Sequence, residues 1–224
     1  MMIGRHPFRR SSFDRLVIAL AGPAAIACAS YSPHHTARLV PAGTNEASFA
    51  ADALVVDRGL GPEVFALPEF ALSRGLSDEW DAGGRVYPFG IELNTRRRLL
   101  RYGRALMSLM PLVAVSQVSA TNPDTSFVDL NAGAVLLNGL TLSPKLELTL
   151  GLRSQLRLGL NAVAVREDFD AARWGILTGT SAALRWRVSE GSTLVPGVVV
   201  LFPYDLDRDL WDFPIFQGGA AVTW

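Results

Sequence analysis

Residues Lys145–Asn161 read KLELTLGLRSQLRLGLN, and their polarity alternates at every second position. The even positions carry leucine, with Ser154 as the one exception, and the odd positions from Glu147 onward carry polar residues or glycine. A helix would mix these two sets on every face, whereas a strand separates them completely. The stretch therefore predicts a β-strand, although leucine is not a favoured strand residue.

Weaker versions of this alternation recur from residue 46 to the C-terminus, and short turns alternate with longer polar segments along most of the chain. The link at 88–90 is the exception, because it is as short as a turn. About ten strands are expected, within a range of eight to twelve. Their approximate bounds are 46–57, 64–76, 79–88, 91–101, 105–118, 126–142, 145–165, 174–188, 193–203 and 214–224. An even number of strands places the start of the first strand and the end of the last strand on the side of the short turns, where these two strands can pair. The sequence thus predicts an all-β domain over 46–224, a closed antiparallel up-and-down β-barrel.

Composition excludes several classes of protein. A hydrophobic content of 49% and a mean hydropathy of +0.23 exclude intrinsic disorder. The 21 basic and 21 acidic residues balance to zero net charge, which gives no reason to expect nucleic acid as a partner. No apolar run reaches the roughly 18 residues of a membrane-spanning helix. The single cysteine, Cys28, excludes an intrachain disulfide framework.

Residues 1–27 have the layout of an export signal, in which arginines precede the apolar stretch 16–27, LVIALAGPAAIA. The residues Ala25-Ile26-Ala27-Cys28 resemble the lipobox of bacterial lipoproteins, although leucine is usual where Ala25 stands. This resemblance implies cleavage before Cys28 and lipidation of its thiol. Cleavage near Ala27 or Ala29 by an ordinary signal peptidase is the alternative. Residues 28–45, rich in Ser, Thr, Pro, Gly and Ala, are predicted to form the lipidated N-terminus and a flexible linker.

The polar positions of the predicted strands carry charges that are expected to face the barrel interior. One interpretation is a filled lumen in which these charges pair, without a continuous pore. The other is an anion-preferring channel lined by arginine. The predicted lumen-facing charges are Arg85, Arg153, Arg157, Arg185, Arg187, Asp81 and Asp129.

The distribution of histidine argues against an enzyme. The chain has three histidines: His6 lies in the predicted signal, and His34 and His35 lie in the predicted linker. No histidine is thus expected inside the barrel to act as a general base. We predict no catalytic residues, no metal site and no cofactor.

The pattern and the termini resemble small outer-membrane β-barrel proteins of Gram-negative bacteria, in which the apolar set faces lipid and the polar set faces inward. The C-terminal Trp224 resembles the signature by which the barrel-insertion machinery recognises such proteins. The resemblance implies an outer-membrane location, lipid as a partner, and a structural, interaction or small-solute passage role. The alternative is a lipid-anchored soluble periplasmic barrel, with its leucine face inward, that binds a hydrophobic ligand or a protein partner.

Overall fold

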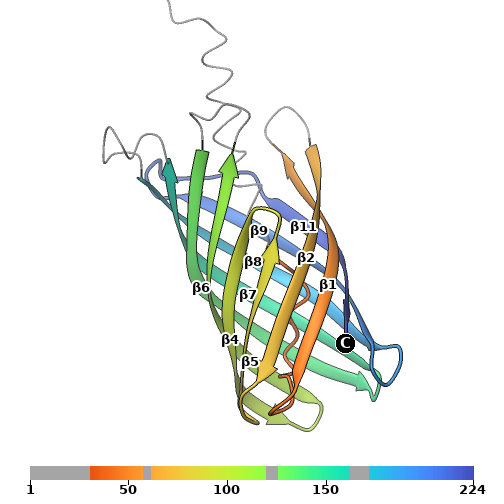
Figure 1. Ribbon diagram of the computed structural model, residues 1–224. Coiled ribbons are helices and arrows are strands. Elements are labelled where there is room, and N and C mark those ends of the chain that lie inside the picture. Colours follow the sequence, from red (N-terminus) through yellow and green to blue (C-terminus); the bar gives the residue numbers. More distant parts are fainter. Residues whose placement is uncertain (1–30, 58–61, 120–125, 162–171) are drawn as a thin grey trace, which may run out of the picture.

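The computed structural model describes residues 31–57, 62–119, 126–161 and 172–224, and they form a single antiparallel sheet (Figure 1). No helix in these ranges is long and apolar enough to cross a membrane. The ten wall strands are β1 Asn45–Asp57, β2 Pro62–Gly75, β3 Trp80–Tyr87, β4 Gly90–Tyr102, β5 Ala105–Ser119, β6 Ser126–Ser143, β7 Leu146–Asn161, β8 Ala172–Arg187, β9 Thr193–Asp205 and β11 Ile215–Thr223. A short eleventh strand, β10 Leu210–Trp211, pairs only with β9.

The sheet closes on itself. Strand β9 pairs with both β8 and β11, and β11 pairs with β1. At the seam the backbone of Ala47 both donates to and accepts from Trp224, at 2.9 and 3.0 Å. The predicted all-β, closed, ten-stranded antiparallel barrel is confirmed, with β10 as an addition. The last part of the predicted strand 145–165, residues 162–165, lies outside the described residues.

The two ends of the barrel differ in their connections. Residues 76–79, 103–104, 144–145 and 188–192 connect strands at one end, which we call the short-turn end. The wall begins with β1 and finishes with β11 at this same end, as an even strand number requires. The opposite end carries the connections after β1, β3, β5, β7 and β9, and we call it the long-loop end because those after β5, β7 and β9 are longer; residues 88–89 after β3 are an exception, as short as a turn.

The apolar face of the wall points outward. In β7, Leu150, Leu152 and Leu156 are 46–56% exposed, whereas Arg153 and Gln155 between them are buried. The same alternation places the polar side chains of the wall around the lumen. This arrangement contradicts the soluble alternative, which requires the leucine face to line the interior.

Exposed aromatic side chains gather at both ends of this apolar face. At the short-turn end they are Trp80, Tyr102, Trp186 and Trp224, and at the long-loop end they are Trp174, Phe202 and Phe216. The stretch from Trp174 to Trp186 corresponds to about 30 Å of height at ~3.4 Å per residue and a tilt of roughly 40°. Tyr87 departs from the pattern, because it is buried and packs over the Arg85 guanidinium inside the lumen.

The segment before β1 runs inside the barrel (red-orange in Figure 1). Within residues 31–42, which we call the lumen strap, Tyr31, Ala37 and Val40 are each only 2–3% exposed. The described part of residues 28–45 therefore does not form the flexible linker that the sequence predicted. Four of its polar residues, Ser32, His34, His35 and Thr36, lie along a lumen that is itself largely polar, so polar residues in this segment do not signal exposure.

Substitution of Leu152 by arginine tests the membrane-facing orientation of the wall. Because Leu152 lies near the middle of the outward face, Leu152→Arg is expected to lower the free energy of unfolding in phospholipid vesicles by about 2–4 kcal/mol. Leu142→Arg, at the short-turn end of the same face, is the matched control and is expected to cost at most about 1 kcal/mol. Urea titration of the refolded proteins measures both values. Two equal and negligible losses would indicate a face exposed to water.

Candidate functional site

The strap is anchored to the wall near the short-turn end. The Val40 backbone N–H donates to Asp81 Oδ2 at 2.8 Å, and Arg38 Nε donates to Glu147 Oε2 at 2.9 Å. Between them, Ser108 Oγ donates to the Ala37 carbonyl at 2.6 Å. Three different strands, β3, β5 and β7, therefore hold one short stretch of the strap.

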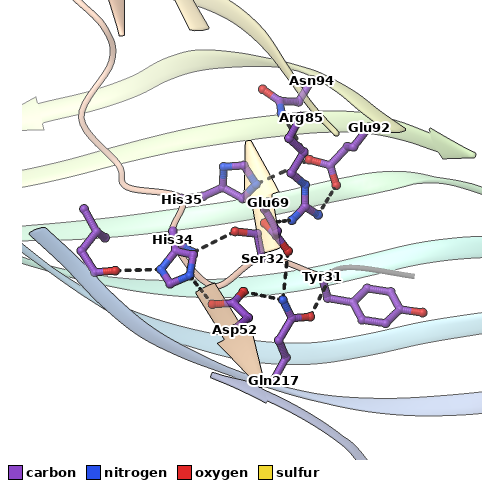
Figure 2. Close-up of polar contacts among 11 residues, drawn as sticks. Tyr31, Ser32, His34, His35, Asp52, Glu69, Arg85, Glu92, Asn94 and Gln217 are labelled. Carbon is purple, nitrogen blue, oxygen red and sulfur yellow. Dashed lines mark hydrogen bonds and ion pairs between the residues drawn. The ribbon is translucent and has the colours of Figure 1, made fainter. Parts of the chain in front are cut away.

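Closer to the N-terminal end of the strap, His34 bridges β1 and β9 (Figure 2). Its Nε2 lies 2.7 Å from Asp52 Oδ1, and its Nδ1 lies 2.8 Å from the carbonyl oxygen of Val195. Both partners are acceptors, one a carboxylate oxygen and the other a backbone carbonyl oxygen, so each ring nitrogen of His34 faces an acceptor. The next residue, His35, places its Nε2 3.5 Å from Glu92 Oε1.

At its N-terminal end the strap changes from polar contacts to apolar ones. The Tyr31 backbone N–H donates to Gln217 Oε1 at 2.9 Å. The Tyr31 side chain packs within an apolar collar formed by Leu54, Leu67, Leu177, Val199, Leu201 and Ile215. The collar fills the lumen around Tyr31 with side chains that exclude water.

The wall beside the strap carries a buried ionic network (Figure 2). Arg85 donates to Glu69 at 3.0 Å and to Glu92 at 2.7 Å, and all three side chains are at most 3% exposed. Gln217 Nε2 extends the network by donating to Asp52 Oδ2 at 2.6 Å and to Glu69 Oε1 at 3.1 Å. Buried carboxylates are tolerated only with such partners, since taking an unpaired charge out of water costs several kcal/mol.

The predicted lumen-facing charges occupy different levels of the barrel. Asp81, Arg85, Asp129 and Arg153 are at most 5% exposed. Arg96 binds both oxygens of the Asp81 carboxylate, donating from Nε to Oδ1 and from Nη2 to Oδ2. Arg157 pairs with Asp129 at 2.8 Å, and Arg185 lies 3.6 Å from Glu46. Arg187 is exposed at the short-turn end, where it lines a shallow hollow with Arg38, Glu147 and Arg185.

Several lumen residues were not expected from the sequence. His34 and His35 lie inside the barrel, so the prediction that no histidine reaches the interior is wrong. Asp52 and Glu69 are isolated carboxylates in the middle of apolar stretches, AADALVV and ALPEFAL. A mid-strand charge on the inward parity is the signal that would have marked both as lumen residues.

His34 is nevertheless not arranged to act as a base for the neighbouring Ser32. Ser32 Oγ accepts a bond from the His34 backbone N–H at 3.4 Å, and both ring nitrogens of His34 are already engaged. No ring nitrogen of His34 is left to take a proton from Ser32, as a nucleophile–base pair requires. Among the described residues, no group of three or more His, Cys, Asp or Glu could hold a metal ion.

A polar cavity lies between the strap and the wall. Its volume is about 60 Å³, and its lining includes Ser32, His34, Glu69, Arg85, Asn94 and Arg185. A cavity of this size and polarity holds a few water molecules, and it is far smaller than the ~300 Å³ of a small-molecule pocket. This cavity is therefore too small for a typical small-molecule ligand.

Comparison with known proteins returns no matching family model and no matching curated protein. Solved structures with a similar fold include neisserial surface protein A, with 12% identity, a TM-score of 0.44, and 80% of this chain and 95% of that chain covered. The Escherichia coli outer membrane protease OmpT aligns with 10% identity, a TM-score of 0.47, and 86% and 99% covered. The attachment invasion locus protein Ail of Yersinia pestis aligns with 11% identity, a TM-score of 0.33, and 80% and 97% covered. At these identities the likeness concerns the barrel fold alone.

Removal of the central guanidinium tests the ionic network. Arg85→Gln leaves Glu69 and Glu92 buried without their cation, so the free energy of unfolding is expected to fall by about 3–5 kcal/mol. Arg101→Gln, at an exposed position on the next strand, is the control and is expected to change it by less than about 0.5 kcal/mol. Urea midpoints of the refolded proteins give both values. Equal midpoints for the two variants would show that the network does not stabilise the barrel.

Proposed function

We propose that this protein is an outer-membrane β-barrel. The supporting observation is the outward apolar face, about 30 Å high by strand length and tilt, with aromatic side chains at both rims. A closed barrel satisfies all its backbone hydrogen bonds internally, which is the condition for crossing a bilayer with strands. In barrels of this kind the short turns lie in the periplasm and the longer loops lie on the outside of the cell. The short-turn end is accordingly assigned to the periplasm.

Within that class, a structural or interaction role fits the lumen best. The strap and the apolar collar around Tyr31 fill the interior, and the arginines of the wall are largely paired with carboxylates. This arrangement favours the filled lumen over an arginine-lined anion channel. The protein would then act through the surfaces that it presents at the membrane rather than by passing solutes.

Two features of the termini complete the proposal. Trp224 is 56% exposed on the same face as Val222, and it seals the seam with Ala47. This position suits recognition by the barrel-insertion machinery. Cys28 lies outside the described residues, and its lipidation, together with removal of residues 1–27, remains part of the proposal on the strength of the lipobox resemblance.

A small-solute passage is a second candidate, because the strap is held mainly by polar contacts beside a water-sized cavity. Such contacts exchange for water at little net cost, so withdrawal of the strap is the route to an open state in this second candidate. In this case the closed lumen is a resting state of a channel.

Planar-bilayer recording tests the closed lumen. The mature full-length chain is expected to show no stepwise ion conductance, because the strap fills the lumen. Deletion of residues 30–42 is expected to produce conductance, since it removes Tyr31 from the collar and Arg38 from Glu147. Steady conductance by the full-length chain would contradict the proposed role and favour the channel. Silence of both chains would mean that the wall side chains alone close the lumen.

Fractionation tests the membrane location. A chain lacking residues 1–28 is expected to require detergent for solubility, because its leucine face is outward and large. The triple variant Leu150→Gln, Leu152→Gln and Leu156→Gln is the control, and it should shift the protein toward the soluble fraction. A detergent-free soluble monomer of the unsubstituted chain would contradict the membrane barrel.

A further inference from the structure

The strap has a direction. Its C-terminal end lies at the short-turn end of the barrel, where Ala42 bridges to Gly75, the last residue of β2. The backbone N–H of Gly43 also donates to the Gly75 carbonyl at 2.9 Å. Slightly further in, Arg38 pairs with Glu147, the second residue of β7. Residues 38–42 therefore all lie near the short-turn end.

The N-terminal end of the strap lies near the opposite mouth. Tyr31 packs against Ile215, the first residue of β11, and against Leu54, close to the end of β1 at Asp57. Both of these wall residues belong to the long-loop end of their strands. His34, with its contact to Asp52, lies between the two ends of the strap. From residue 42 back to residue 31, the contacts of the strap therefore move steadily from the short-turn end of the lumen to its long-loop end.

From this direction we infer that the protein threads its own lumen and presents its processed N-terminus at the cell surface. The inference rests on the proposed function, which assigns the long-loop end to the outside. The wall is hydrogen-bonded all the way round, so it leaves the mouths as the exits for the chain. Tyr31 lies next to the outer mouth, and the strap behind it already fills the route to the periplasm.

The reach of the chain sharpens the inference for a lipidated protein. Two residues lie between Cys28 and Tyr31, and even a fully extended chain covers only about 10 Å over these three Cα–Cα steps. The hydrocarbon core of a bilayer is about 30 Å thick. An acyl group on Cys28 would therefore lie on the outer side of the membrane, out of reach of the periplasmic leaflet.

Antibody labelling of cells tests this topology with the full chain. A short epitope is inserted between Ala29 and Ser30, and labelling is compared on intact and permeabilised Gram-negative cells. One control carries the epitope between Asp207 and Arg208, in the exposed turn before β10 at the long-loop end. The other carries it between Glu190 and Gly191, in the exposed turn between β8 and β9 at the short-turn end. Folding of each chain is checked by its heat-dependent shift in gel mobility, and a misfolded N-terminal insertion is replaced by one between Cys28 and Ala29.

The expected result is that the N-terminal epitope is labelled on intact cells to the level of the Asp207 control, with no gain after permeabilisation. The Glu190 control should be labelled only after permeabilisation. If the N-terminal epitope behaves like the Glu190 control while the Asp207 epitope is labelled on intact cells, the threading inference is overturned and the membrane barrel stands. If the Asp207 epitope itself needs permeabilisation, the orientation in the proposed function is wrong, and the inference falls with it.

Discussion

Closure of the sheet between β1 and β11 is the constraint on which the other features depend. Once Ala47 and Trp224 pair at the seam, each of the ten wall strands in the described part of the chain has a neighbour on both sides. The backbone then needs neither water nor a partner protein to satisfy its hydrogen bonds. Closure of the sheet therefore allows the outward face to be apolar. It also encloses the polar face, whose side chains must form hydrogen bonds and ion pairs with one another.

The lumen meets this requirement by matching charges from different strands. Asp81 is clamped by Arg96, Asp129 by Arg157, and Glu69 shares Arg85 with Glu92. The strap contributes to the same balance, because Arg38 and His34 each face a wall carboxylate. The strap is thus a component of the ionic network, and the carboxylates of β1 and β7 are positioned to receive it.

Much of the wall could be predicted from the sequence, and the reason is geometric. Alternation with period two depends only on the pleat of a strand, so Lys145–Asn161 reveals its two faces without any neighbour. The pairing of the charged side chains in the lumen could not be predicted from the sequence in the same way. Arg85 and Glu92 lie near each other in sequence, but Gln217 reaches Asp52 across the seam, between residues 165 positions apart. Such contacts become visible only once the barrel is closed.

The strap escaped prediction for a different physical reason. Sequence reading equates burial with hydrophobicity, and residues 31–42 mix polar residues (Ser32, His34, His35, Thr36 and Arg38) with an equal number of apolar ones and two prolines, without a periodic apolar face. That equation holds for a core built from apolar faces. In a barrel whose apolar face is turned outward, the enclosed volume is the polar one, and a polar segment with donors at the right intervals is what fits it. The position of the strap is specified by three pairs: His34 with Asp52, Arg38 with Glu147, and the Val40 N–H with Asp81. In a soluble core, an apolar stripe specifies the position of a segment in the same way.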